Sequence, residues 1–169
     1  FVFAGDGKLV DAMYIEFDVT FPSARVGSMV GIMGACEYGN ISGETSSKWA
    51  LQGSGDSARK KVAFSLSGGN KVYYQDMGGY GGGNVNGFID ASAYNVNSHK
   101  LAVLRNGYDF YVFIDGDYLG KYTTTTYGKG GFGLILTNPV GSGTDYVTKN
   151  ENIRYITDKN VIAMMTKDI

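Results

Sequence analysis

The fold is indicated by one stretch of sequence, Leu101-Ala-Val-Leu-Arg-Asn-Gly-Tyr-Asp-Phe-Tyr-Val-Phe-Ile-Asp-Gly-Asp-Tyr-Leu-Gly-Lys-Tyr-Thr123. Its three apolar segments, each short enough for one strand, are Leu101–Arg105, Phe110–Ile114 and Tyr118–Thr123. They are separated by Asn106-Gly107 and Asp115-Gly116, and such pairs are preferred in two-residue hairpin turns because they tolerate positive φ. The stretch therefore predicts three consecutive antiparallel strands.

The same two-residue alternation runs outward from this meander in both directions. In Met13–Phe21, one face carries Ile15, Phe17, Val19 and Phe21, and the other carries Tyr14, Glu16, Asp18 and Thr20. Further strands are predicted at Ser28–Gly34, Trp49–Gln52, Val62–Leu66, Val72–Gln75, Phe132–Thr137 and Ile153–Thr157. The tail Asn160–Lys167 fits either a last strand or a short helix. Many short strands without crossover helices predict an all-β fold, a two-sheet antiparallel β-sandwich or jelly roll, with a barrel as the alternative.

Composition narrows the class of protein. A chain of 169 residues, 43% of them hydrophobic, predicts a single domain spanning residues 1–169 with a core of its own. The net charge of -1 disfavours a nucleic-acid partner, which would require a concentrated basic surface. No apolar run approaches the roughly 20 residues that cross a bilayer, so we expect no membrane insertion. The single cysteine, Cys36, is interpreted as a small packed hydrophobe.

A family resemblance rests on four segments. His99–Gly120 resembles the concanavalin A-like lectin and glucanase superfamily, including its laminin-G-like and carbohydrate-binding-module-like branches. Gly131–Thr137 and Asn152–Ile156 are similar to that superfamily's closing strands, and Ile15–Phe21 to an early one. The resemblance implies a jelly-roll domain at the cell surface or outside the cell. It also implies that the domain binds glycans, proteins or surfaces and is one module of a larger multidomain protein.

Two carboxylates raise the question of an enzyme. Glu16 and Asp18 lie two residues apart and share one strand face, and glycoside hydrolysis uses carboxylate pairs. Laminarinase-like members of the superfamily carry Glu-x-Asp-x-x-Glu or Glu-x-Asp-x-Glu, whereas here the third position is Phe21 or Thr20. We therefore assign no catalytic residue and expect a noncatalytic domain, with a laminarinase-like glycoside hydrolase as an alternative.

No cofactor is assigned from the sequence. His99, the only histidine, begins a strand and is interpreted as an exposed strand-end residue. Asp115-Gly116-Asp117 offers two close carboxylates, so a structural calcium ion is an alternative. The hairpin turn already accounts for Asp115, and we assign no metal ligands.

The remaining candidates are aromatic and amide residues outside the expected core. Sugar rings present apolar C–H faces and hydroxyl groups, so a glycan site combines flat aromatic rings with planar amides. The candidates are Tyr38, Trp49, Tyr73, Gln75, Tyr80, Asn84, Asn86 and Tyr94. Trp49 also fits a core position, and Phe17, Phe64, Phe110 and Phe132 are predicted to build the core. The sequence predicts a carbohydrate-binding, lectin-like module with a glycan partner, and the alternative is a protein-binding adhesion or structural module of the same fold.

Overall fold

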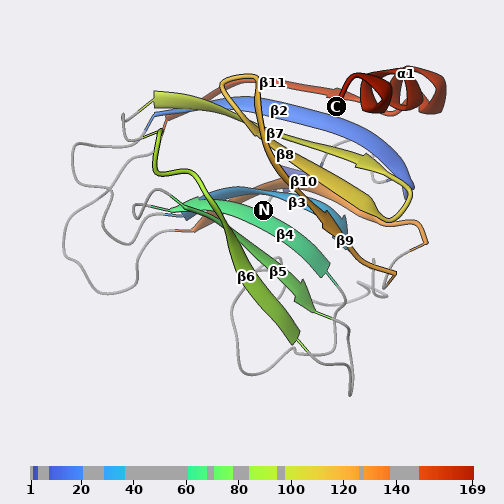
Figure 1. Ribbon diagram of the computed structural model, residues 1–169, viewed down its shortest axis with the longest axis horizontal. Coiled ribbons are helices and arrows are strands. Elements are labelled where there is room, and N and C mark those ends of the chain that lie inside the picture. The colour runs from blue at the N-terminus through green and yellow to red at the C-terminus, as the bar shows by residue number, and fades with distance from the viewer. Residues whose placement is uncertain are drawn as a thin grey trace.

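The computed structural model describes residues 2–3, 8–20, 29–36, 61–67, 71–77, 84–94, 98–125, 128–137 and 149–169. Within these residues the chain forms two antiparallel sheets stacked as layers (Figure 1). The six-stranded sheet has the order β1 (Val2–Phe3), β10 (Gly131–Thr137), β3 (Met29–Cys36), β4 (Lys61–Ser67), β5 (Lys71–Met77) and β6 (Asn84–Asp90). The five-stranded sheet has the order β11 (Lys149–Ile156), β2 (Ala12–Thr20), β7 (Ser98–Asn106), β8 (Asp109–Ile114) and β9 (Asp117–Thr123). This arrangement confirms the predicted two-sheet β-sandwich.

The predicted meander is confirmed as β7, β8 and β9. Asp115 and Gly116 form the second turn with φ angles of 55° and 93°, as a tight hairpin requires. The first turn lies one residue later than predicted, because Asn106 is still paired with Asp109 and the turn residues are Gly107 and Tyr108. Of these two residues, only Gly107 has a positive φ, 64°. The Trp49–Gln52 prediction lies outside the described residues.

Strand β6 was missing from the sequence prediction, which placed Asn84 and Asn86 in or beside loops. Its sequence, Asn-Val-Asn-Gly-Phe-Ile-Asp, has two asparagines and a glycine, residues that strands disfavour. Packing explains the glycine: a Cβ at Gly87 would lie 2.3 Å from the hydroxyl oxygen of Tyr74 on the neighbouring strand. Gly87 therefore makes room for the Tyr74 ring, and this tertiary contact outweighs the local preference.

The core lies between the sheets and is built by the residues that alternate inward. The predicted core residues Phe17, Phe64, Phe110 and Phe132 are all fully buried. The rings of Phe64 and Phe110, one from each sheet, have centroids 5.6 Å apart. These contacts join the two layers.

A buried arginine ties neighbouring segments to β7. Arg105 is fully buried, and its guanidinium donates hydrogen bonds to three backbone carbonyls. The acceptors are Gly107 at 2.9 Å, Val10 at 2.9 Å and Gly128 at 3.1 Å. These bonds compensate for the desolvation of a buried charge. Arg105 thereby connects the segments that precede β2 and β10 to β7.

The C-terminal tail is a helix, α1 (Lys159–Met165), followed by a 3₁₀ turn at Thr166–Asp168. The carboxylate of Asp158 caps it by accepting hydrogen bonds from backbone N–H groups of the first turn. Ile162 of α1 is buried against Ala12 of β2 and Leu104 of β7. The helix thus lies on the outer side of the five-stranded sheet and covers two apolar residues that face away from the main core (Figure 1).

Candidate functional site

The sequence-predicted candidates divide into three groups. Tyr73 and Gln75 lie on β5, and Asn84 and Asn86 lie on the neighbouring strand β6, so the fold brings these four into one part of the six-stranded sheet. Gln75 stands opposite Asn86 in the register. Tyr94 follows β6 and makes its contacts elsewhere. The predictions at Tyr38, Trp49 and Tyr80 lie outside the described residues.

Tyr73 and Phe88 form an exposed aromatic pair, here called the aromatic platform. They are directly opposite in the β5–β6 register, and their ring centroids are 6.4 Å apart with the planes tilted by 58°. Tyr73 is 39% exposed and Phe88 is 53% exposed. The sequence analysis missed Phe88 because β6 was not predicted. Its signal was the alternation along the strand, which puts Phe88 on the face opposite its neighbour Ile89, and Ile89 packs against the core.

The orientation of the platform is set by its inward-facing neighbour. Tyr74, next to Tyr73, turns toward the core and stacks on Tyr122 of β9, with ring centroids 4.5 Å apart. The Tyr122 hydroxyl donates a hydrogen bond of 2.8 Å to the buried carboxylate of Asp76. Burial, together with this bond, raises the pKa of Tyr122. Because Tyr74 and Asp76 are held on the inner face, Tyr73 must face outward.

On the strands next to the platform, the residues in the same row of the six-stranded sheet are small. Phe88 and Tyr73 are followed in the register by Ser65 on β4 and Gly31 on β3. A Cβ at Gly31 would lie 2.3 Å from the Phe64 carbonyl oxygen, so this position requires glycine. Ser65 is buried even though it faces away from the core. The accessible part of this row therefore lies on β5 and β6.

Tyr94 is held against the five-stranded sheet by two contacts. Its hydroxyl donates a 2.9 Å hydrogen bond to Asp117 of β9, which raises the pKa of Tyr94. Its ring meets the His99 ring edge-on, with centroids 6.1 Å apart. It also packs partly buried against the main core. These contacts hold the Tyr94 ring beside β7 and β9.

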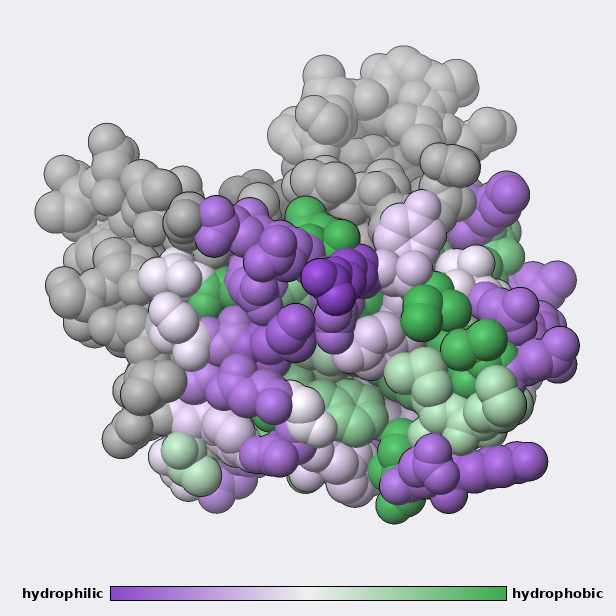
Figure 2. Space-filling model, turned by 90° about the horizontal axis from the view of Figure 1, so that it is seen from above, coloured by the Kyte–Doolittle hydropathy of each residue, from purple (hydrophilic) through white to green (hydrophobic). Residues whose placement is uncertain are grey.

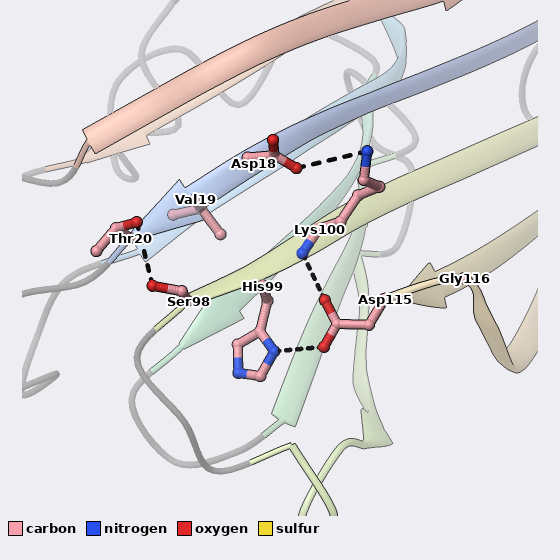
Figure 3. Close-up of a pocket in the computed structure, with 8 residues that line it drawn as sticks. All are labelled: Asp18, Val19, Thr20, Ser98, His99, Lys100, Asp115 and Gly116. Carbon is pink, nitrogen blue, oxygen red and sulfur yellow. Dashed lines mark hydrogen bonds and ion pairs between the residues drawn. The ribbon is translucent and has the colours of Figure 1, made fainter.

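A second feature is an open hollow of about 510 Å³ at one end of the sandwich, here called the polar hollow (Figure 3). It lies where β2 ends, where β7 begins and where β8 turns into β9. Its lining residues are Asp18, Val19, Thr20, Ser98, His99, Lys100, Asp115 and Gly116. The sequence analysis did not predict this hollow, because its residues come from three segments that only the sheet brings together.

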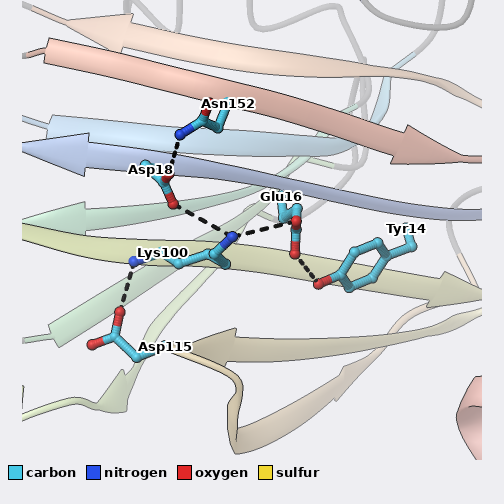
Figure 4. Close-up of polar contacts among 6 residues, drawn as sticks. All are labelled: Tyr14, Glu16, Asp18, Lys100, Asp115 and Asn152. Atoms are coloured by element: carbon cyan, nitrogen blue, oxygen red, sulfur yellow. Dashed lines mark hydrogen bonds and ion pairs between the residues drawn. The ribbon is translucent and has the colours of Figure 1, made fainter.

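Lys100 is the centre of the polar contacts beside the hollow (Figure 4). Its ammonium lies 3.4 Å from Glu16 Oε1 and 3.5 Å from Asp18 Oδ1. Asn152 of β11 donates a 2.7 Å hydrogen bond to Asp18, and this bond, with the charge of Lys100, holds the pKa of Asp18 below its ordinary value. The Tyr14 hydroxyl donates to Glu16 at 2.6 Å. Both carboxylates of the predicted pair are therefore engaged with other residues of the protein.

His99 is buried, and the prediction of an exposed strand-end residue was wrong. Its side chain is fully covered, and Nδ1 lies 2.9 Å from Asp115 Oδ2. The other carboxylate oxygen of Asp115 accepts a 2.7 Å hydrogen bond from the Lys100 backbone N–H. His99 faces inward because it keeps the alternation of β7, and the carboxylate at the hairpin turn satisfies its polar edge.

The two aspartates considered for calcium are both held by protein groups. Asp115 contacts His99 and the Lys100 backbone, and Asp117 accepts the hydrogen bond from Tyr94. Among the described residues, no group of three or more His, Cys, Asp or Glu side chains is arranged to hold a metal ion. The described part of the chain also has no helix long and apolar enough to cross a membrane.

On the outer face of the five-stranded sheet, hydrophilic and hydrophobic residues gather in different places (Figure 2). This view looks onto the five-stranded sheet, and hydrophilic residues spread across the middle of the face, while hydrophobic residues gather toward the side where α1 lies in Figure 1. Tyr118, 46% exposed, packs against Phe113 on this sheet with ring centroids 5.8 Å apart. Tyr118 is thus an exposed aromatic residue, packed against a second ring, on the sheet that does not carry the aromatic platform.

Solved structures similar to this chain include a carbohydrate-binding module, a galectin and a beta-glucanase. The carbohydrate-binding module CBM66 from Bacillus subtilis aligns with 90% of this chain and 83% of its own, at 13% identity and a TM-score of 0.54. The fold is a jelly-roll β-sandwich. Sheep galectin-11 aligns with 90% of this chain and 99% of its own, at 9% identity and a TM-score of 0.54. The Bacillus licheniformis beta-glucanase aligns with 88% of this chain and 67% of its own, at 16% identity and a TM-score of 0.55.

The similarity is confined to the fold. No family model matches the chain, and no curated protein matches it in sequence. A concanavalin A-like sandwich hosts lectins, noncatalytic modules and enzymes, so the activity must be argued from the surface residues.

Proposed function

We propose that this chain is a noncatalytic carbohydrate-binding domain whose ligand stacks on the aromatic platform formed by Tyr73 and Phe88. The observation that carries the proposal is this exposed, cross-strand pair on a rigid sheet. Solvent-exposed aromatic rings favour ligands with apolar faces, and a pyranose ring presents such a face through its C–H groups. The similarity in fold to a carbohydrate-binding module and a galectin supports the same ligand class.

The neighbours of the platform suit a hydroxyl-rich ligand. In the β5–β6 register, Gln75 and Asn86 form the pair two residues along from the pair of Tyr73 and Phe88. Amides can both donate and accept hydrogen bonds, which matches sugar hydroxyls. The ring of Tyr74, locked against Tyr122, keeps β5 and β6 in place before a ligand arrives. A preformed site loses less conformational entropy on binding.

The noncatalytic part of the proposal rests on the carboxylate pair. Glu16 is bound by Tyr14 and Lys100, and its side chain is only 14% exposed. A glycosidase needs one carboxylic acid that protonates the leaving group and a second carboxylate that faces the sugar. A reducing-sugar assay with β-glucan should therefore detect no release by the wild type. Release that Glu16→Gln abolishes would instead establish a hydrolase.

A location outside the cell, within a larger surface or secreted protein, belongs to the same proposal. Its support is the resemblance of His99–Gly120 to a superfamily rich in extracellular modules. Surface labelling of the producing cells with a membrane-impermeant reagent tests it. Labelling of this domain only after cell lysis would contradict it.

The binding experiment is a glycan array followed by titration calorimetry with the best polysaccharide. Tyr73→Ala and Phe88→Ala should each weaken binding by about tenfold or more, since fully covering an apolar side chain such as Phe contributes about 1.5–3 kcal/mol. Tyr118→Ala is the matched control, because Tyr118 is equally exposed and equally paired on the other sheet. An unchanged affinity in Tyr73→Ala, or no glycan bound at all, would overturn the proposal. A loss confined to Tyr118→Ala would move the site to the five-stranded sheet.

A further inference from the structure

We infer that the sugar recognised at the aromatic platform carries an anionic group, a carboxylate or a sulfate ester, and that Lys71 binds this group. The inference rests on the proposed function, since it names the ligand class of the same site. Lys71 precedes Tyr73 by two residues on β5, so both belong to the same face of the strand.

The ammonium of Lys71 is part of the platform. Its Nζ lies 4.0 Å from the centroid of the Phe88 ring, well inside the range of a cation–π contact. Phe88 is at the same time in contact with the Tyr73 ring. A sugar that stacks on these rings therefore brings its substituents next to a fixed positive charge.

Among the described residues, no carboxylate lies within ion-pair distance of the Lys71 ammonium. Asp90 stands opposite Lys71 in the register, but no ion pair joins them. The Asp90 carboxylate instead accepts a 2.9 Å hydrogen bond from the Ser92 backbone N–H. That bond is the largest cause of the lowered pKa of Asp90, and the charge of Lys71 is the smallest.

Three other lysines of the described residues lie close to carboxylates. Lys100 and Lys159 lie 3.4 Å and 2.8 Å from carboxylate oxygens. Lys121 lies 5.8 Å from the Tyr111 ring centroid on the other sheet, but its ammonium is also 3.3 Å from Asp109. Lys71 thus combines an exposed ring with a cation available to a ligand anion, whereas the comparable cation at Lys121 is already paired.

The ligand chemistry follows from this contrast. An anionic substituent would form a charge-assisted hydrogen bond with the Lys71 ammonium, and such bonds are about twice as strong as neutral ones. A neutral sugar would stack on the same rings without that gain. Because the site is at the surface, the preference should weaken as salt is added.

The test compares ligands that differ only in charge. Polygalacturonate is measured against its methyl-esterified form, and carrageenan, a sulfated galactan, against the same polymer after chemical desulfation. Wild-type protein should bind at least one anionic polymer about tenfold more tightly than its neutral counterpart at low salt. Lys71→Gln should remove this preference, Lys71→Arg should keep it, and Lys121→Gln should leave it unchanged. A preference within the polygalacturonate pair identifies a carboxylate as the anionic group of the ligand, and a preference within the carrageenan pair identifies a sulfate.

The failures of the two proposals are distinguishable. Equal binding of charged and neutral polymers, or a preference that survives in Lys71→Gln, overturns the inference about charge. If Tyr73→Ala still abolishes binding in that case, the proposed function stands. If no polymer binds, both are wrong. Circular dichroism of each variant confirms that the sandwich is folded.

Discussion

Tyr74 of β5 stacks on Tyr122 of β9, with ring centroids 4.5 Å apart and an angle of 29° between the planes. The contact joins the two sheets directly behind the aromatic platform. It depends on Gly87, because a side chain there would occupy the space of the Tyr74 hydroxyl. The orientation of the surface residues Tyr73 and Phe88 is thus fixed from inside the sandwich.

Substitution of Gly87 tests this dependence. Gly87→Ala puts a methyl group 2.3 Å from the Tyr74 hydroxyl oxygen, so the ring must move and the free energy of unfolding should fall by about 1–3 kcal/mol. Gly120→Ala is the control, since its Cβ would lie 3.4 Å from Ile89. Urea unfolding measures both. Equal stability of the two variants would show that Tyr74 is not tightly held.

Arg105 is expected to be essential for stability. Arg105→Met keeps much of the volume but removes the buried guanidinium and its hydrogen bonds to three backbone carbonyls, so we expect a loss of about 3 kcal/mol or more. Arg105→Lys should also lose stability, because one ammonium cannot reproduce the three-point geometry. Thermal unfolding monitored by circular dichroism gives the comparison, with Lys121→Met as a surface control. A melting temperature for Arg105→Met close to that of the control would contradict the role.

Acid should destabilise the protein in part through Asp18. Its hydrogen bond from Asn152 and the charge of Lys100 make its folded-state pKa lower than its unfolded-state pKa. Such a group stabilises the fold above its unfolded pKa, and the contribution is lost as the pH falls through the folded value. Asp18→Asn should therefore be less stable than wild type at pH 7, with the difference shrinking between about pH 5 and pH 2. A difference that stays constant with pH would exclude this contribution.

The cap of α1 can be removed without touching the sandwich core. Asp158→Ala should cost about 1 kcal/mol of helix stability, whereas Asp158→Asn should cost less because an amide oxygen still accepts the hydrogen bonds. Hydrogen exchange of the α1 amides measures the effect locally. We expect faster exchange in α1 and unchanged exchange in β8. Slower or unchanged exchange in α1 would show that Ile162 alone holds the helix.

The part of the fold that sequence reasoning predicted is the part with local signals. The Asp115-Gly116 turn and the alternation in β2 are visible in neighbouring residues, so the meander and the inward face of Ile15, Phe17 and Val19 were confirmed. β6 was missed because its glycine is explained by Tyr74 on another strand. The helix at Lys159–Met165 was left open because Ile162 packs on residues distant in the sequence.

The candidate site was only partly visible for the same reason. Tyr73 was placed on the outer face because Val72 and Tyr74 occupy the other one, and its exposure confirms that placement. Its partner Phe88 and the nearby Lys71 depend on the β5–β6 register, which no local pattern specified. The burial of His99 likewise depends on Asp115 from the next hairpin.

The most direct test of the central claim is a chemical-shift map of a bound glycan. Amide resonances of the ¹⁵N-labelled protein are followed while the best polysaccharide fragment from the array is added. The account predicts that the largest shifts fall on residues 71–77 and 84–90, around Tyr73 and Phe88. Shifts concentrated on residues 109–123, around Tyr118, or no shifts with any glycan, would contradict it.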